Sequence, residues 1–255
     1  MLKRRIIPTL LLKDVGLVKG KAFDSWRRVG TVLPAIKVYD RRDVDELILL
    51  DISAYREGRG PDVDTVRDAA SECSVPLAVG GGVRSVDDVR TLLRAGADKV
   101  CINSAAYRTP DLVTSAARAF GSQCVVVSID VRGSVPEAQC YSCSGTRCEQ
   151  VGPVAWARRV EALGAGEILL TSVDRDGTMS GYDIDLLKAV TSAVNVPVIA
   201  SGGAGSYEDL HLALRDGSAS AAAAASIYHF TELTPLGAKA YLAEKGIPVR
   251  IDTTR

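Results

Sequence analysis

The sequence predicts an α/β fold in which parallel strands alternate with helices. Short apolar runs alternate regularly with amphipathic stretches along the whole chain. The apolar runs are unbroken, as in strands that are buried on both faces. The chain also repeats itself at about half its length, which a closed structure of two equivalent halves explains. Together these observations predict a single domain over residues 1–255, a (β/α)8 or TIM barrel built from two homologous half-barrels.

The elements follow in order along the chain. The candidate strands cover 5–11, 46–51, 76–80, 98–103, 124–130, 167–172, 196–201 and 220–226. The helical patterns lie near 34–43, 62–73, 85–95, 109–119, 152–163, 183–192, 206–216 and 232–244. Ser85 with Asp88, and Ser206 with Asp209, are typical of helix-opening caps.

The repeat relates the halves by a constant shift of 121 residues. Residues 46–64 reappear at 167–185, and residues 81–96 reappear at 202–217. After a small slip, the strand that ends in Asp130 corresponds to the first strand, where Leu11 stands at the equivalent place. A doubly wound open sheet is the alternative fold, but it does not explain a repeat of half the length.

Composition excludes several classes of function. Lys and Arg number 31, as do Asp and Glu, so no net charge attracts the chain to nucleic acid or to an anionic membrane. No apolar run approaches the roughly 20 residues of a membrane helix. The basic and then apolar start reads as a first strand rather than a signal peptide. We expect a soluble cytoplasmic protein without a cofactor.

Glycine pairs follow a strand and precede a helix once in each half. At Gly81-Gly82 and at Gly202-Gly203, backbone N–H groups and a helix N-terminus can hold an anion. Asn103-Ser104 and Ala225-Ser226 end the neighbouring strands. Two such cradles on opposite sides predict a ligand that is phosphorylated at both ends. Tight turns between a strand and a helix are the alternative use of these glycines.

Asp130 ends the fifth strand and is the candidate acid or base at the catalytic end of the barrel. A capping role in the following loop is the alternative. Asp51 and Asp176 are predicted near the same place, either to bind ligand hydroxyls or to cap loops.

Four charged residues stand at strand starts, at the opposite end of the barrel. They are Arg5, Glu46, Lys99 and Glu167. Two cations and two anions can pair as a ring, whereas each would be costly to bury alone. From the pattern alone, a set of structural salt bridges is the ordinary interpretation.

Long motifs extend over nearly the whole chain. They include DELILLDISA, VGGGV, ADKVCIN, FGSQCVVVSID, GAGEILLTSVDRDGTMSGYD and VIASGGAGS. In these segments the chain resembles the cyclase subunit of imidazole glycerol phosphate synthase. The resemblance implies a barrel that receives ammonia from a glutaminase partner and uses it on a bisphosphorylated ribulosyl substrate. The products would be imidazole glycerol phosphate and the aminoimidazole ribotide AICAR.

The resemblance also implies roles for individual residues. The family's two catalytic aspartates fall on positions 11 and 130. Its phosphate contacts fall on Gly82, Asn103, Ser104, Gly177, Gly203, Ala225 and Ser226. Lys19 matches a residue on a mobile first loop, and Asp98 matches a contact with the glutaminase. Arg5, Glu46, Lys99 and Glu167 match the gate through which ammonia enters the barrel.

The chain departs from the family pattern at three places. Leu11, in PTLLLKDVGLVKG, can neither give nor take a proton, and Asp14 beside Lys13 is a poor substitute. Segments 38–46 and 139–151 differ as well. These departures resemble a paralogous branch that accompanies sugar amidation in surface-polysaccharide biosynthesis.

The departures lead to competing interpretations. We favour a subunit that conducts ammonia from a glutaminase to a third, ATP-using synthetase that amidates a sugar, because the entrance is kept while half of the catalytic pair is lost. An active cyclase that has replaced its first aspartate is the alternative, and a ligand-binding regulatory barrel is a further one.

Three cysteines lie close together in the sequence after the fifth strand, at Cys140, Cys143 and Cys148. This spacing is a weak candidate for zinc because no fourth ligand lies nearby. Incidental thiols in a variable loop are the favoured interpretation.

Overall fold

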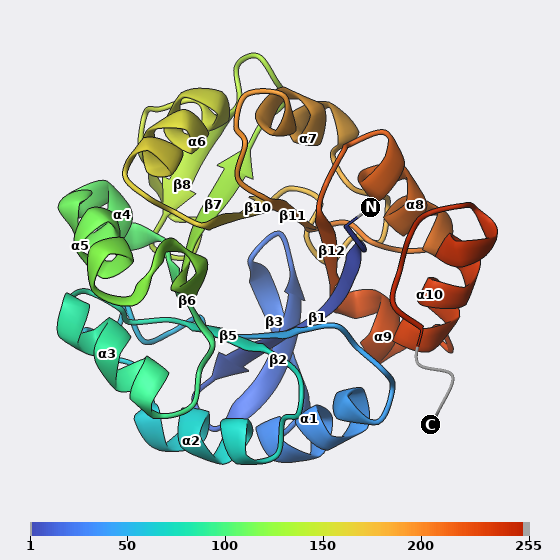
Figure 1. Ribbon diagram of the computed structural model, residues 1–255, viewed down its shortest axis with the longest axis horizontal. Helices are drawn as coiled ribbons and strands as arrows, with labels where there is room; N and C mark the ends of the chain where they lie inside the picture. Colours follow the sequence, from blue (N-terminus) through green and yellow to red (C-terminus); the bar gives the residue numbers. More distant parts are fainter. Residues whose placement is uncertain (1, 252–255) are drawn as a thin grey trace.

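The computed structural model describes residues 2–251 and shows a closed barrel (Figure 1). Its parallel strands are β1 (Arg5–Lys13), β4 (Leu47–Asp51), β5 (Leu77–Gly80), β6 (Lys99–Ile102), β7 (Val125–Arg132), β10 (Glu167–Ser172), β11 (Val198–Ser201) and β12 (Ala221–Ala224). Each pairs in parallel with both neighbours, and the β7–β10 and β12–β1 pairings close the circle. The predicted (β/α)8 barrel is therefore confirmed.

An outer layer of helices covers the barrel on all sides (Figure 1). The helices that follow the barrel strands are α1 (Val32–Asp40), α2 (Val63–Ser71), α3 (Val86–Arg94), α5 (Asp111–Phe120), α6 (Pro153–Ala162), α7 (Ile184–Thr191), α8 (Tyr207–Arg215) and α10 (Pro235–Glu244). Short helices α4 (Ser104–Arg108), α9 (Ser226–Phe230) and the 3-10 turn η1 (Ser122–Cys124) complete the set in the described chain.

The two halves begin their helices in the same way. Ser85 and Ser206 each accept a bond from a backbone N–H three residues on, and Asp88 and Asp209 complete reciprocal capping boxes as predicted. The repeat thus fixes helix starts as well as strands.

The strand register proves that Leu11 and Asp130 are equivalent positions. Leu11 pairs with Leu50 on the neighbouring strand β4, and Asp130 pairs with Thr171 on β10. Positions 50 and 171 are related by the shift of 121 residues. The two side chains therefore stand at matching places in the two halves.

A hairpin follows the first strand of each half, which the sequence analysis did not predict. Strands β2 (Gly16–Lys21) and β3 (Asp24–Gly30) extend β1, and β8 (Gln139–Ser142) and β9 (Arg147–Cys148) extend β7, all antiparallel. The expectations of a loop at Lys19 and of a plain loop at 139–151 were wrong. In each case the barrel strand continues past the barrel, and the hairpin pairs with this extension through antiparallel backbone hydrogen bonds.

Each hairpin crosses to the other half of the molecule. Lys19 Nζ of the first hairpin lies 2.7 Å from Asp176 Oδ1, and Ala22 N donates to Asp176 O at 2.8 Å. In the second hairpin, Cys143 N donates to Ser104 Oγ at 2.9 Å and Ser144 Oγ donates to Ile52 O at 2.8 Å. The halves are therefore interlocked at one end of the barrel.

Two apolar clusters hold the fold together. The larger one fills the space between strands and helices, and a smaller one fills the barrel interior. The interior cluster takes residues from every barrel strand: Ile7, Ile48, Ala78, Cys101, Val126, Leu169, Ile199, Ala221 and Ala223. Packed side chains thus close the tube between its two ends. In the described chain, no helix is both long and apolar enough to cross a membrane.

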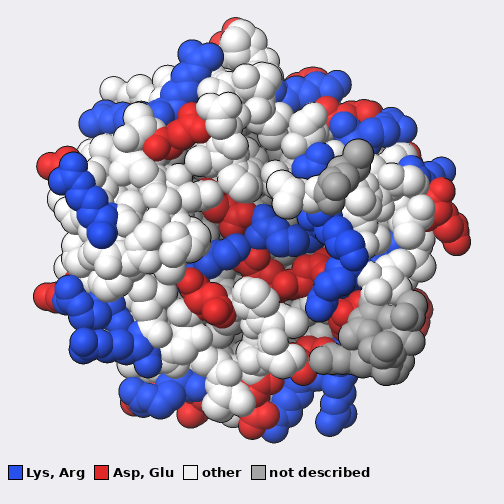
Figure 2. Space-filling model, viewed as in Figure 1, with Lys and Arg blue, Asp and Glu red and all other residues white. Residues whose placement is uncertain are grey.

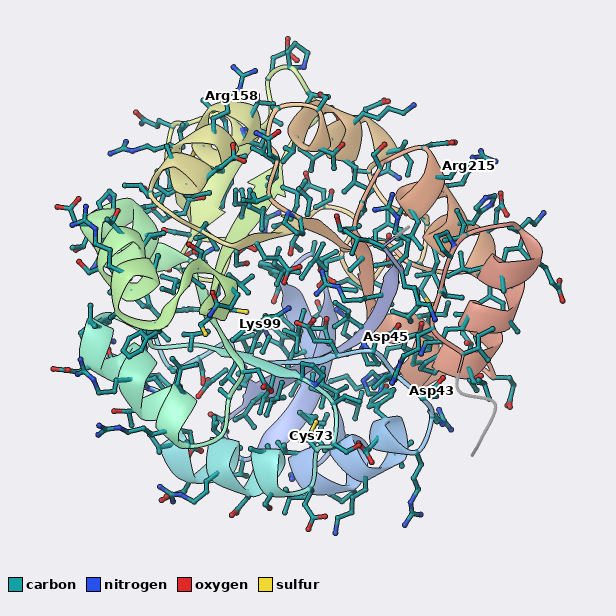
Figure 3. The ribbon with its side chains drawn as sticks, viewed as in Figure 1. Asp43, Asp45, Cys73, Lys99, Arg158 and Arg215 are labelled. Atoms are coloured by element: carbon teal, nitrogen blue, oxygen red, sulfur yellow. The ribbon has the colours of Figure 1, made fainter. Side chains whose placement is uncertain are left out.

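The first and last described segments of the chain meet beside the barrel. Arg4 N donates to Pro248 O at 2.7 Å. Lys239 of α10 is fully buried, and its Nζ lies 2.8 Å from Asp45 Oδ1 and 3.3 Å from Asp43 Oδ2. Asp43 and Asp45 come from the segment between α1 and β4, as labelled in Figure 3. These buried, paired charges fasten the last helix to the rest of the barrel.

Candidate functional site at the carboxyl ends of the strands

The carboxyl ends of the barrel strands surround one large cavity, which we call the mouth. Its empty space, which includes the part continuous with the surrounding solvent, is about 1200 Å³. Most predicted site residues line it: Leu11, Lys19, Asp51, Gly82, Asn103, Ser104, Asp130, Asp176, Gly177, Gly203, Ala225 and Ser226. Residues more than 200 positions apart in the sequence thus meet in one pocket.

Asp130 lies at the centre of a polar network in the mouth. Asn103 Nδ2 donates to its Oδ2 at 3.0 Å, and Ser128 Oγ lies 3.3 Å from its Oδ1. The pKa of Asp130 is raised to about 7, chiefly because the group is buried. The hydrogen bond from Ser128 works against this rise, and the negative charge of Asp176 adds to it. Strand β7 continues past Asp130 to Arg132, so this residue does not cap a loop. A carboxyl with such a pKa can give or take a proton near neutral pH.

Leu11 also lines the mouth, at the position equivalent to Asp130. Its side chain is buried, and its only hydrogen-bonding groups belong to the backbone. The first half therefore presents an apolar surface where the second half presents a carboxyl group.

Lys19 and Asp176 form a buried ion pair across the mouth. Lys19 is 5% exposed and Asp176 is 7% exposed, so both charges are withdrawn from water. Asp176 Oδ1 accepts from Lys19, whereas Oδ2 is buried and has no hydrogen-bond partner. A buried carboxylate oxygen without a partner is unfavourable unless a ligand supplies a donor.

Asp51 has little capacity left for a ligand. Its Oδ1 accepts from Ser53 N, Ser53 Oγ and Ala54 N, each at 3.0 Å. Its Oδ2 lies 3.1 Å from Arg59 Nη1. Of the two predicted roles, the loop-capping one agrees with these contacts.

The two glycine cradles have the same backbone conformation, but their serine hydroxyls differ in hydrogen bonding. Gly81, Gly82, Gly202 and Gly203 all adopt positive φ. A side chain at Gly82 or Gly203 would collide with backbone atoms, so glycine is needed there. In the first cradle Ser104 Oγ accepts from Cys143 N, whereas in the second Ser226 Oγ is buried without a partner. The second cradle is therefore the open one.

Sequence reasoning missed several residues of the mouth. Ser128 stands two residues before Asp130, so the alternation of a strand places both on one face and could have revealed it. Phe23 and Trp26 arrive on the first hairpin and Ser144 arrives on the second. These three could not be found because the hairpins were not predicted.

The opposite ends of the strands, which we call the floor, carry the charged ring. Glu46 accepts from Arg5 Nη1 at 2.6 Å and lies 2.8 Å from Lys99 Nζ. Glu167 binds Arg5 Nη2, and it lies 2.8 Å from Lys99 Nζ. Figure 2 shows charged side chains gathered at the centre of this face, and Figure 3 labels Lys99 there. Each carboxylate thus pairs with both cations.

Asp98 is exposed beside the ring. Its Oδ2 accepts from Leu77 N at 2.8 Å, and so it caps the start of β5. The bond fixes an exposed carboxylate on the floor, where a partner could reach it.

Only a thin apolar layer separates the ring from the mouth. Cys101 and Leu169 line the cavity and belong to the interior cluster, and they lie two residues beyond Lys99 and Glu167 on the same strands. Two residues of strand span roughly 7 Å. Ring, apolar layer and mouth are thus stacked along one axis.

The three clustered cysteines are not gathered around one point. Within residues 2–251, no three or more His, Cys, Asp or Glu side chains are grouped so as to hold a metal ion. Cys140 is buried on β8, Cys143 lies in the hairpin turn and Cys148 is exposed on β9. The thiols therefore point into different environments.

Comparison with known proteins gives matches over the full length. The family described as "Histidine biosynthesis protein" matches residues 5–234. The "Imidazole glycerol phosphate synthase subunit HisF" of Caulobacter vibrioides (strain NA1000 / CB15N) is 51% identical over 257 residues, covering 100% of this chain and 99% of that protein. The protein of the same name from Hyphomonas neptunium (strain ATCC 15444) is 53% identical over 250 residues, covering 98% and 99%.

These relatives correct the favoured interpretation of the sequence. Amidation of a sugar in polysaccharide biosynthesis, with an ATP-using synthetase as a partner, is contradicted because similar proteins of the same length are named as synthase subunits. The prediction gave too much weight to Leu11 and to segments 38–46 and 139–151. The alternative interpretation agrees better with the relatives.

Proposed function

Because the chain belongs to the histidine biosynthesis protein family, we propose that it is the cyclase subunit of an imidazole glycerol phosphate synthase. It takes ammonia from a glutaminase and uses it on a bisphosphorylated ribulosyl substrate. Imidazole glycerol phosphate and AICAR are the products.

The stacking of charged ring, apolar layer and mouth along one axis carries this proposal. Ammonia is small and uncharged, so it can pass between the packed side chains at Cys101 and Leu169 more easily than an ion. Lys99 makes two of the four ion pairs of the ring, and Arg5 makes the other two. Displacing Lys99 would therefore break half of the pairs that close the entrance. The route ends in a cavity that contains Asp130.

The two cradles support a substrate with a phosphate group at each end. They lie in opposite halves, with Asp130 on a strand of the barrel between them. Gly82, Asn103 and Ser104 would hold one phosphate, and Gly203, Ala225 and Ser226 the other, with Gly177 nearby. Binding at both ends would fix the reactive carbon over the centre of the mouth.

The glutaminase would dock on the floor. The ring is open to solvent there through Arg5 and Lys99, whose side chains are 24% and 19% exposed. Asp98 offers a fixed carboxylate beside it. A partner that releases ammonia at this surface would deliver it directly to the entrance.

An ammonia-dependent assay tests the proposal. The purified chain is given an ammonium salt and the bisphosphorylated ribulosyl substrate, and both products are measured. We expect turnover by the wild type and a faster reaction by Leu11→Asp, which restores a second carboxyl group. Absence of product from the wild type, together with product from Leu11→Asp, would show that the natural chain lacks the activity.

The same assay bears on the finer resemblance to the polysaccharide-associated branch. That resemblance stays a prediction, and it depends on the residues around Leu11 and on segment 139–151. A member of a branch without cyclase chemistry would yield no product in this assay.

A further inference from the structure

A carboxylate other than the one lost at position 11 is available in the mouth. Asp176 lines the same cavity as Asp130 and comes from the loop after β10. Asp130 comes from β7, the strand that pairs with β10. Because both carboxyl groups line the same cavity, one bound substrate can contact both.

The two oxygens of Asp176 have different surroundings. Oδ1 accepts from Lys19 Nζ at 2.7 Å, while Oδ2 is buried and unpartnered. The backbone of Asp176 is held on both sides, since its N donates to Val173 O at 3.1 Å and its O accepts from Ala22 N at 2.8 Å. Such a fixed carboxylate with one free oxygen has the form of a general base.

We propose that Asp176 is the second catalytic carboxylate of this chain and takes the proton-handling place that Leu11 leaves empty. The proposal rests on the proposed cyclase function. It assigns the acid to Asp130 and the base to Asp176, with Lys19 as the group that positions the base.

Together the two carboxyl groups can carry the proton transfers that addition of ammonia requires. Ammonia attacks the ketone carbon of the ribulosyl group, and a C–N bond forms as the C=O bond becomes a single bond. Asp176 Oδ2 accepts a proton from the nitrogen, and protonated Asp130 gives a proton to the oxygen. The addition thus moves one proton from Asp130 to Asp176 and leaves the total charge of the enzyme unchanged.

The surroundings of the two carboxyl groups suit this division. Asp130 has a pKa of about 7 because it is desolvated, so it retains its proton in a large share of molecules at neutral pH. Asp176 faces a lysine instead. Asp130 thus has a proton to give, and Asp176 has one oxygen held by Lys19 and one without a partner.

Four proteins test the proposal in the ammonia-dependent assay: the wild type, Asp176→Asn, Leu11→Asp/Asp176→Asn and, as a control, Asp174→Asn. Asp174 lies in the same loop, but it is exposed and binds Arg132 and Gly133 instead of the cavity. We expect Asp176→Asn to lower kcat by about 10²–10⁴-fold with little change in KM. The control should retain its kcat, and the double variant should recover at least tenfold.

The outcomes separate this inference from the proposed function. No turnover by the wild type would overturn both. Turnover by the wild type with a normal kcat for Asp176→Asn would overturn the inference alone. A rise in KM without a fall in kcat would show that Asp176 binds a substrate hydroxyl, and failure of Leu11→Asp to rescue would show that its role is structural; both results also overturn it.

Discussion

The two half-barrels have nearly the same backbone and unequal chemistry. Both open a helix with Ser and Asp in a reciprocal capping box, and both extend their first strand into a hairpin. At matching register positions, however, one half carries Leu11 and the other carries Asp130. The comparison teaches that backbone symmetry is imposed by the fold, whereas side chains in the mouth are free to differ.

The floor does not share this inequality. Glu46 and Glu167 are related by the shift of 121 residues, and each binds both Arg5 and Lys99. A pairing network constrains every member, because removing one carboxylate leaves two cations with only one between them. The following predictions test whether the halves are unequal at the mouth and equal at the floor.

The largest effect is expected from the carboxyl group of the second half. Asp130→Asn should lower ammonia-dependent turnover by about 10²–10⁴-fold, because an amide cannot exchange the proton. Leu11→Asn places the same amide at the equivalent position in the first half and should lower turnover much less. Steady-state kinetics on the two variants measures the difference, and equal losses would contradict the inequality.

The next largest effect is expected at the floor, where equivalent substitutions in the two halves should destabilise the protein by the same amount. Glu46→Gln and Glu167→Gln each leave two cations around one carboxylate, and each should lower the free energy of unfolding by about 2 kcal/mol. Urea unfolding measures both. Asp87→Asn, which breaks the exposed pair with Arg90, is the matched control and should change little. A clear difference between the two Gln variants would disprove the symmetry of the ring.

Asp130 should make stability depend on pH. Its pKa is raised in the folded state to about 7, so the folded chain binds a proton more tightly than the unfolded chain. The contribution to stability is full below the unfolded pKa of about 4 and is lost as pH rises through 7. Asp130→Asn should therefore have a larger free energy of unfolding than the wild type at pH 8, by on the order of 1 kcal/mol or more, and should unfold at a higher temperature.

Calorimetry at two pH values gives the control for this prediction. The advantage of Asp130→Asn should shrink at pH 5, where the wild-type carboxyl is already protonated in the folded state. A constant advantage at both values would mean that the amide improves packing instead of removing a desolvated charge.

The smallest effect is expected between the two cradles. Ser104→Ala removes the acceptor of Cys143 N and should lower the free energy of unfolding by about 1 kcal/mol. Ser226→Ala removes a buried hydroxyl without a partner, so stability should not fall. Inorganic phosphate should protect the wild type against thermal unfolding and Ser226→Ala less well. A loss of stability in Ser226→Ala would show that its hydroxyl is already bonded.

The barrel and the positions at its two ends were predictable because they depend on local patterns. Unbroken apolar runs marked the strands, the repeat placed Leu11 opposite Asp130, and strand starts placed Arg5 and Glu46 on the floor. Parallel strands in a closed barrel leave few choices about which residues share an end.

The cover of the mouth was not predictable, because it depends on contacts between the halves. Lys19 reads as a residue of an exposed loop until Asp176, more than 150 positions away, is placed beside it. Cys143 and Ser144 in the hairpin turn both adopt positive φ, a conformation that neither residue type predicts. Function was misjudged for a related reason: one residue, Leu11, was weighed against motifs that extend over the whole chain.

The crossed hairpins bear on how such a molecule could be assembled from pieces. A fragment ending near Gly121 would present β6 as a bare sheet edge, and its first hairpin would have nothing beneath it. A fragment starting at Ser122 would have the same defect at β7 and in the turn around Cys143. When the two fragments are produced together, each supplies the strand that pairs with the other's exposed sheet edge. Each also supplies the residues that the other's hairpin contacts. Association of the two different fragments should therefore be favoured over association of either fragment with itself.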